Sequence, residues 1–279
     1  MKIGCHVSIA GGIFNAPGNA AKIGGETFQV FTRSPQGGPA PKLTDEVVSQ
    51  FKTAMAKNKF TDFIIHTPYY INFASTTPRI RYGSISVVRD ELERGSLLGA
   101  SYVVTHLGST KDAGPTVGFH KTWRSIQRIL DGYDGSCELL LENSAGAGDL
   151  VGDTFEELAA IIKEVENDHQ YANQLGVCLD FCHAFATGYD LHDRATVDAT
   201  LKQFDQTIGF ARLKTIHAND SKFALGEHKD RHEHIGRGGI GLSGFKLLIK
   251  HPVLNKVNWY LETEPGGVAK DIKLLKSLR

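Results

Sequence analysis

The chain has 279 residues, and its 31 basic and 31 acidic residues give a net charge of zero with histidine neutral. This length suits one (β/α)₈ barrel, which typically needs about 250 residues, or two smaller domains. Balanced charge argues against a strong non-specific nucleic-acid binder, although a local basic or metal-rich surface could still hold phosphates. The twelve histidines carry more information, because many of them stand beside acidic residues in apolar segments.

The sequence shows no feature of export or of membrane insertion. The N-terminal residues MKIGCHVS lack the basic region and long apolar core of a signal peptide. No apolar run approaches the roughly 20 residues of a membrane span, so we expect no membrane partner. The four cysteines form no CxxC pair and lie in apolar runs, which predicts reduced thiols in or near the core.

Short apolar runs that predict strands recur along the whole chain, with helical patterns between them. The predicted strands are residues 2–8, 27–32, 62–68, 102–108, 138–144, 175–181, 212–220 and 258–265. Two of the amphipathic stretches are 43–58, which opens with Thr44, and 154–168. For the second we predict Asp153 as the N-cap, with Glu156 at the capping-box position.

Eight β/α units spaced by about 35 residues predict an α/β fold, a single (β/α)₈ TIM barrel over residues 1–279. A doubly wound open sheet is the alternative, because periodicity alone does not prove closure. A dinucleotide-binding fold is disfavoured, since the Gly11-Gly12 pair after the first strand is not part of a GxGxxG motif.

Six consecutive predicted strands end in a side chain that can bind a metal ion. These residues are His66, His106, Glu142, Asp180, His217 and Glu262. A single histidine at a strand end is commonly a hydrogen-bonded structural residue. Six such residues in register are not expected by accident, and in a (β/α)₈ barrel the C-terminal strand ends converge on the face that carries active sites.

Three more residues extend this set. His183 lies three residues beyond Asp180, and Asp230 and His232 form an i,i+2 pair whose side chains point to the same side of an extended segment. Imidazole with carboxylate suits zinc, manganese or iron better than calcium or magnesium. Nine ligands exceed the needs of one ion, so two or three ions are implied. Clustered metals suit phosphoryl chemistry.

The other histidines fall into two groups. Polar contexts predict solvated surface positions for His120, His169, His192 and His251. Three more stand close to the metal-binding residues and could either support them or pack elsewhere: His6, His228 and His234.

Long strings of this sequence resemble endonuclease IV, and they occur in the family order over nearly the whole chain. They are HVSIAGG, HTPYYINFAS, VVTHLGS, LLLENSAGAG, DFCHAFATGYD, IHANDS, KDRHEHIG and YLETEP. The resemblance implies a (β/α)₈ barrel with three zinc ions in a deep pocket, with manganese or iron as an alternative at one site. By similarity, His66, His106 and Glu142 hold one ion, and Glu142 bridges to a second. The second ion's other ligands are Asp180, His217 and Glu262, and the third ion's are His183, Asp230 and His232.

The resemblance also implies an activity, in which Glu142 is the catalytic residue. Double-stranded DNA is cut 5′ to an abasic site, which leaves a 3′-hydroxyl and a 5′-deoxyribose phosphate, and blocked 3′ ends are cleared. An abasic nucleotide has lost its stacking, so flipping it out of the duplex costs less than flipping an intact one. We expect a monomer that is cytoplasmic and associated with the nucleoid, or nuclear if its source is a eukaryote.

Four residues are candidates for DNA contact. Tyr69 and Tyr70 could fill the gap left in the base stack, or could be ordinary packing residues of a loop. The sequence departs from the family where Gln36 stands in place of an arginine that enters the base stack, with Arg33 earlier in the same loop. It departs again at Arg237, where a glutamate is usual. These departures bear on DNA binding, because the metal-binding set is intact.

Three other functions fit part of this pattern. A metal-dependent sugar isomerase uses a similar barrel, but typically with about four ligands and one or two ions. An ultraviolet-damage endonuclease differs in the lesion it recognises. A DNA-damage binder or a zinc-storage protein is the non-enzymatic alternative.

Overall fold

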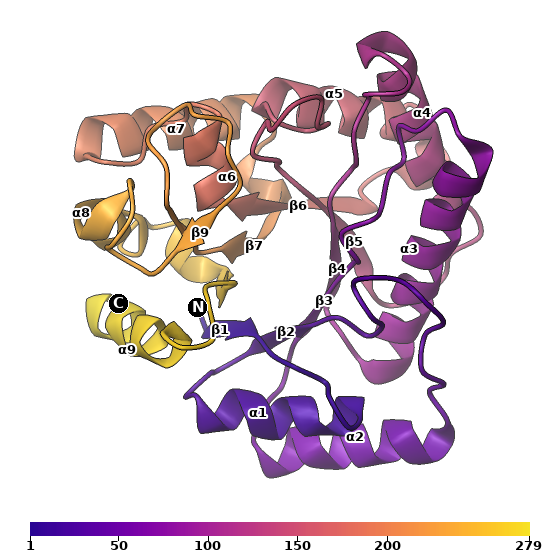
Figure 1. Cartoon of the computed structure of the whole chain (residues 1–279), viewed down its shortest axis with the longest axis horizontal. Coiled ribbons are helices and arrows are strands. Elements are labelled where there is room, and N and C mark those ends of the chain that lie inside the picture. Colours follow the sequence, from indigo (N-terminus) through magenta and orange to yellow (C-terminus); the bar gives the residue numbers. More distant parts are fainter.

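The computed structural model describes all 279 residues, and eight parallel strands form a closed barrel at its centre (Figure 1). The strands are β1 (Ile3–His6), β2 (Phe28–Val30), β3 (Ile64–His66), β4 (Tyr102–Thr105), β5 (Glu138–Glu142), β6 (Leu175–Asp180), β7 (Leu213–His217) and β10 (Asn258–Leu261). Closure is direct, because β1 pairs with both β2 and β10. The predicted (β/α)₈ barrel is therefore confirmed, and the open sheet is excluded.

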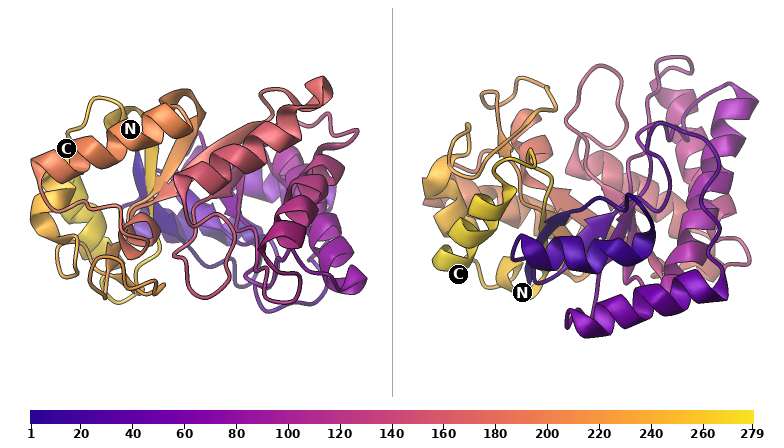
Figure 2. Two further views of the ribbon diagram at one scale, coloured as in Figure 1. Left: turned by 90° about the horizontal axis from the view of Figure 1, so that it is seen from above. Right: turned by 60° about the horizontal axis from the view of Figure 1, so that its bottom comes forward.

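The helices surround the barrel, as Figure 1 shows. They are α1 (Ala16–Lys22), α2 (Asp45–Lys57), α3 (Pro78–Leu98), α4 (Pro115–Leu130), α5 (Phe155–Glu166), α6 (Phe181–Ala186), α7 (Arg194–Thr207), α8 (Gly241–Leu248) and α9 (Val268–Leu278). Short 3₁₀ turns lie at Ile13–Asn15, His169–Tyr171, Phe210–Arg212 and Leu254–Lys256. The two termini lie close together in all views (Figures 1 and 2), and Arg279 Nη1 donates to the carbonyl of Met1 at 3.2 Å.

One of the two predicted helix starts is right and the other is one residue out. Thr44 caps α2 and accepts from Val47 N, as predicted. The prediction of Asp153 for α5 is wrong, because Thr154 is the N-cap and its hydroxyl accepts from Glu157 N at 3.1 Å. The helix begins at Phe155, whose ring is fully buried, so core packing sets the start one residue later.

The interior of the barrel is filled below its C-terminal end. A layer of side chains from five strands packs there: Ile64, Val104, Leu140, Cys178 and Tyr260. A larger apolar core of 60 residues lies between the strands and the helices. All four cysteines are buried and unpaired, which confirms the prediction of reduced core thiols.

A small antiparallel hairpin outside the barrel was not predicted from the sequence. It pairs β8 (Asp220–Ser221) with β9 (His232–Glu233), and the loop between them carries Asp230. Among the helices, none combines the length and apolar character needed to traverse a lipid bilayer.

Candidate metal centre

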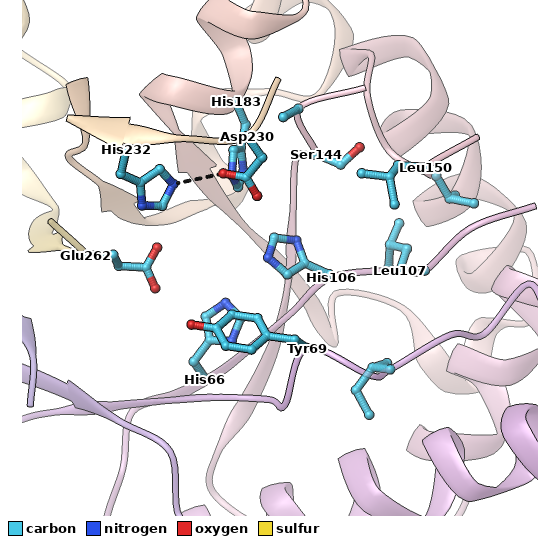
Figure 3. Close-up of a pocket in the computed structure, with 14 residues that line it drawn as sticks. His66, Tyr69, His106, Leu107, Ser144, Leu150, His183, Asp230, His232 and Glu262 are labelled. Atoms are coloured by element: carbon cyan, nitrogen blue, oxygen red, sulfur yellow. Dashed lines mark ion pairs between the residues drawn. The ribbon is translucent and has the colours of Figure 1, made fainter. Parts of the chain in front are cut away.

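The metal-binding candidates lie at the C-terminal end of the barrel because of strand periodicity. Five of the six strand-end candidates follow a residue of the interior layer by two positions: His66, His106, Glu142, Asp180 and Glu262. The sixth, His217, follows the buried Thr215 by two positions. Residues two apart on a strand point to the same face, so a side chain that follows an interior residue by two also points inward. His183 comes from the first turn of α6, and the β8–β9 hairpin brings Asp230 and His232 over the barrel mouth. All nine predicted side chains thus meet in one region. Figure 3 shows those that line the cavity: His66, His106, His183, Asp230, His232 and Glu262.

Glu142 stands at the centre of the cluster and is fully buried. Its Oε1 lies 2.7 Å from His217 Nδ1, and its Oε2 lies 3.0 Å from His66 Nε2 and 3.6 Å from His106 Nε2. His183 Nδ1 is 3.5 Å from Oε1. Burial would raise the pKa of Glu142, but the histidines around it, His217 first, hold that pKa well below its usual value. One carboxylate is therefore shared by four imidazoles.

The donor atoms gather in overlapping groups small enough to hold metal ions. Two groups match sets implied by the resemblance: Glu142 with Asp180, His217 and Glu262, and His183 with Asp230 and His232. The third implied set, His66 with His106 and Glu142, does not form one group. His66 clusters with Glu142 and His217, and His106 clusters with Glu142 and His183. The rings of His66 and His106 are nevertheless only 5.3 Å apart. Cys182, which the sequence analysis did not include, falls within reach of Asp180 and His232.

The orientation of the imidazoles fits metal binding. His66 Nδ1 lies 2.7 Å from the carbonyl of Thr67, and His183 Nδ1 lies 2.9 Å from that of Asn143. A carbonyl only accepts, so Nδ1 carries a proton and Nε2 is the nitrogen directed at the cluster. Metal-bound histidines adopt this orientation, with Nε2 deprotonated when the metal binds. Nε2 of His183 and Nε2 of His232 are buried and form no hydrogen bond of good geometry, although they lie 3.3 Å and 3.4 Å from Asp230 Oδ1. A metal ion in the centre would satisfy both atoms.

Three amide side chains that the sequence analysis missed hold this arrangement. Gln29 Oε1 accepts from His217 Nε2 at 2.8 Å, which turns the other nitrogen of His217 towards Glu142, and Gln29 Nε2 donates to Glu262 at 2.6 Å. Asn219 Nδ2 donates to Asp180 Oδ2 at 2.8 Å. Asn143 accepts from the backbone N–H of Asp180 at 2.7 Å. For two of the three, the position in the sequence could have indicated this role, since Asn143 directly follows Glu142 and Asn219 follows His217 by two residues.

The four carboxylates dominate the electrostatics of the centre. The pKa of His183 is raised well above its usual value, because Asp180 and Asp230 outweigh the effect of burial. Against burial, His217 and His66 lower the pKa of Glu262 to about 2. In His106 burial prevails and lowers the pKa. Carboxylates held ionised beside imidazoles form an environment that favours cations.

A cavity of about 280 Å³ opens onto this cluster. Figure 3 shows His106, His183, Asp230, His232 and Glu262 facing it. The opposite wall is mostly apolar and is formed by Ile71, Leu107, Ala145, Leu150 and Val151. The site therefore combines a dense set of charged donors with a largely apolar opposite wall.

The structure separates the four DNA-contact candidates. Tyr69 lines the cavity with its side chain 69% exposed, and its ring meets Phe31 edge-on at 5.3 Å. Tyr70 is 39% exposed and does not line the cavity, and Gln36 is exposed in its loop.

Arg33 is placed differently from the prediction. It is 7% exposed, and its guanidinium is paired with Asp90 and Glu91 of α3. A direct DNA contact by Arg33 does not fit this position, because its guanidinium is buried and its positive charge is compensated by both carboxylates. Arg237, the second departure from the family pattern, is exposed.

The histidines predicted to lie on the surface are largely where their sequence contexts indicate. His120, His169 and His192 are exposed, and His251 is half-buried. None of these four lines the cavity at the barrel mouth.

The three histidines close to the metal-binding residues in sequence differ in their surroundings. His6 borders the centre, since its Nδ1 lies 3.2 Å from Gln29 Nε2, and burial lowers its pKa to about 4. His228 is exposed. His234 points elsewhere, because its Nδ1 lies 2.7 Å from Asp271 Oδ2. Of the three, only His6 therefore adjoins the residues that support the cluster.

Comparison with known proteins places this fold and site. The family described as "Xylose isomerase-like TIM barrel" matches residues 17–278. "Probable endonuclease 4" of Halothermothrix orenii is 39% identical over 280 residues, which cover 100% of this chain and 99% of that protein. The crystal structure of endonuclease IV from Thermus thermophilus superposes with a TM-score of 0.86 at 30% identity, covering 100% of this chain and 98% of that one. A D-tagatose 3-epimerase-like protein has a TM-score of 0.76 at 18% identity, over 100% of this chain and 97% of that one, which shows a shared fold.

These matches define a barrel of the xylose isomerase-like class. Within that class, the chain belongs to the endonuclease IV family.

Proposed function

We propose that this protein is a zinc-dependent phosphodiesterase of DNA repair. Its substrate is double-stranded DNA with an abasic site, which it cuts on the 5′ side to leave a 3′-hydroxyl and a 5′-deoxyribose phosphate. It also removes blocking groups from 3′ ends. The observation that carries the proposal is the cluster of five imidazoles and four carboxylates, in which the buried Nε2 atoms of His183 and His232 both face Asp230. The chain's full-length relatives are named "Probable endonuclease 4".

The nine side chains supply enough ligands for three ions in the sets described above, with Glu142 shared between two of them. Manganese or iron is an alternative at one position. Zinc ions, when bound, lower the pKa of water towards neutrality and stabilise negative charge on the oxygens of a phosphate. The protein's own contribution is to fix the ligands: Gln29, Asn143 and Asn219 orient His217, Asp180 and Glu262 through the hydrogen bonds given above.

The cavity accounts for selectivity towards a damaged nucleotide. Its wall opposite the ionised cluster is apolar and includes Leu107, Leu150 and Val151. A nucleotide without a base enters such a site at lower cost than an intact one, because less stacking is lost. Tyr69, exposed at the rim, is placed to stack on a base left without its neighbour, and Tyr70 and Gln36 are further candidates for contact with the duplex.

A sugar isomerase is the main competing function, because the same fold occurs in the epimerase-like protein. The group of His183, Asp230 and His232 favours the nuclease, since it adds a third set of ligands to those that one or two ions require. An ultraviolet-damage endonuclease would use the same metal ligands but recognise a different lesion. A zinc-storage protein would use them without acting on DNA.

The test is to incubate the purified protein with a duplex that carries one abasic analogue, with and without a chelator, and to analyse the ends of the products. We expect a nick 5′ to the analogue that ends in a 3′-hydroxyl, and loss of cutting when zinc is removed. Cutting that requires an ultraviolet photoproduct, or epimerisation of a ketose without nicking, would contradict the proposal.

A further inference from the structure

A basic groove runs along the outside of the barrel between α3 and α4, and it shares no lining residue with the cavity of the metal centre. The two helices lie side by side in Figure 1, and the groove between them encloses about 340 Å³. Its lining includes Arg81, Tyr82, Ile85, Lys121, Arg124 and Arg128. We call this surface the α3–α4 groove.

The cations of the α3–α4 groove have no acidic partners. None of the four forms an ion pair within 4.0 Å, and no carboxylate lines the groove. Elsewhere on the surface, cations such as Arg212 and Lys222 are paired with carboxylates. Because the whole chain carries no net charge, this uncompensated set is a local concentration of positive potential.

A tyrosine holds two of these cations together. The guanidinium of Arg81, from α3, lies 4.8 Å from the centre of the Tyr82 ring, and that of Arg128, from α4, lies 5.2 Å from it. Cation–π attraction keeps both groups on the ring. Two like charges on one ring repel each other, and a bound anion would offset that repulsion. Each guanidinium can bind a phosphate group through two N–H donors.

The α3–α4 groove adjoins loops at the mouth of the barrel. Arg81 Nη1 donates to the carbonyl of Ser75 at 2.9 Å. Ser75 in turn donates to Asp112 at 2.7 Å. Ser75 lies in the loop after β3, and Asp112 lies in the loop after β4. The ends of these two strands carry His66 and His106, so the groove begins beside the loops that surround the metal centre.

The spacing of the cations on α4 suits a nucleic-acid backbone. Lys121, Arg124 and Arg128 are three and four residues apart, so they share one face of the helix. From Lys121 to Arg128 the helix rises by about 10 Å, at about 1.5 Å per residue. One strand of DNA carries a phosphate about every 3.4 Å of duplex axis, so a stretch of about 10 Å of that axis holds about three phosphates of the strand.

We propose that the α3–α4 groove binds the sugar–phosphate backbone of the duplex at a distance from the lesion. The groove thereby supplies an attraction that the neutral side chain of Gln36 does not. This inference rests on the proposed function, since it takes DNA as the substrate. An acidic protein segment would also match the charge of the groove. The position of the groove beside the barrel-mouth loops favours the DNA that is already held there.

The test compares two abasic duplexes, a short one confined to the cavity and a longer one that reaches the α3–α4 groove. Both carry an uncleavable methylphosphonate in place of the phosphodiester beside the lesion, so that binding is measured without cutting. The variant replaces Arg124 and Arg128 with glutamine. The control replaces Lys52 and Lys57 of α2 with glutamine, which removes the same charge from another exposed helix.

We expect the Arg124→Gln, Arg128→Gln variant to bind the long duplex roughly ten- to sixtyfold more weakly at about 0.1 M salt, because two phosphate contacts are lost. The slope of log affinity against log salt should fall by about 2. Affinity for the short duplex, and the rate at which a cleavable short duplex is nicked, should match those of the wild type. The control variant should behave as the wild type with both duplexes.

The outcomes separate this inference from the function on which it rests. If the wild type neither binds nor nicks an abasic duplex, the proposed function fails and the inference falls with it. Normal nicking with unchanged affinity of the variant for the long duplex overturns the inference alone. Equal weakening on both duplexes also overturns it, because the arginines would then act on the fold or on the cavity. If polyglutamate binds the wild type better than the variant while long-duplex affinity stays the same, the groove serves a protein partner instead.

Discussion

Replacing Asp220 with asparagine should loosen the hairpin that carries two of the proposed zinc ligands. Asp220 is completely buried in β8, and its carboxylate accepts hydrogen bonds from backbone N–H groups on both oxygens. Oδ1 accepts from Ser221 and Ile240 at 2.9 Å each, and Oδ2 accepts from Gly236 and Gly238 at 3.0 Å each. This one side chain fixes the glycine-rich loop after β9 against β8.

The magnitude of the effect follows from these four bonds. Asparagine keeps one acceptor oxygen and places an NH₂ group where the other was, so at least two of the N–H donors lose their acceptor. An unsatisfied buried donor costs about 1–3 kcal/mol, which gives a loss of about 2–6 kcal/mol for two. The loop has little room to adjust, since a Cβ atom at Gly238 would lie 2.2 Å from the carbonyl oxygen of Ser221. The hairpin with Asp230 and His232 should then release its zinc ion.

The assay is urea unfolding of Asp220→Asn, combined with elemental analysis of zinc after gel filtration. We expect a lower free energy of unfolding and about one zinc ion fewer per chain than in the wild type. Asp193→Asn is the matched control, because Asp193 is an exposed N-cap of α7 and asparagine caps a helix about as well as aspartate. If Asp220→Asn unfolds within about 1 kcal/mol of the wild type and keeps all its zinc, the reasoning about the buried carboxylate is refuted.

Four other substitutions test the centre and its rim. Glu142→Gln should lower the rate of abasic-site cleavage on the order of a thousandfold or more in a kinetic assay, because it removes the charge of the shared ligand while the fold is kept. Gln29→Ala should weaken zinc binding about 10- to 100-fold in a competition titration with a chelator, because His217 and Glu262 lose the amide that orients them. Tyr69→Ala should raise the dissociation constant for abasic DNA roughly five- to a hundredfold in a binding titration with zinc content unchanged, whereas Gln36→Arg should lower it, most clearly at moderate salt.

Each of these has a control and a result that would contradict it. Glu138→Gln makes the same chemical change at the far end of β5, where Glu138 faces Lys214, and it should cut normally. His169→Ala should also change little. Near-normal cutting by Glu142→Gln would mean that the centre is misplaced, and wild-type zinc affinity in Gln29→Ala would remove the amide from its orienting role. Unaltered DNA affinity in the Tyr69 variant would exclude the tyrosine from the recognition surface, and weaker binding by Gln36→Arg would show that this loop does not reach the duplex.

The fold was predictable because each strand has a simple local pattern. In β3, β4, β5, β6 and β10 an apolar run is followed by a polar side chain that continues the inward face of the strand. The start of α5 was placed one residue early because Asp153 and Thr154 are both good caps, and the burial of Phe155 decides between them. The β8–β9 hairpin was missed because strands of two residues show no periodicity.

The sequence predicted the metal-binding side chains that stand at the ends of their own strands. It did not predict the residues that hold them in place from distant parts of the chain. Gln29 lies in an apolar strand, and its partner His217 is 188 residues away, so nothing local in the sequence indicates the contact. The same limit explains Arg33, whose partners Asp90 and Glu91 lie on α3, 57 and 58 residues further along the chain. The role of Asp220 likewise depends on loop N–H groups up to 21 residues away.

The most direct test of zinc-dependent cleavage at abasic sites is a single-turnover cleavage assay on a sample whose zinc content is known. Two duplexes that differ only in one abasic analogue are incubated with the wild type, before and after removal of zinc and after its return. We expect about three zinc ions per chain. We also expect one nick 5′ to the analogue, no cutting of the intact duplex, and recovery of cutting when zinc is restored. A protein that holds a single ion, or that cuts the two duplexes alike, would contradict the proposed function.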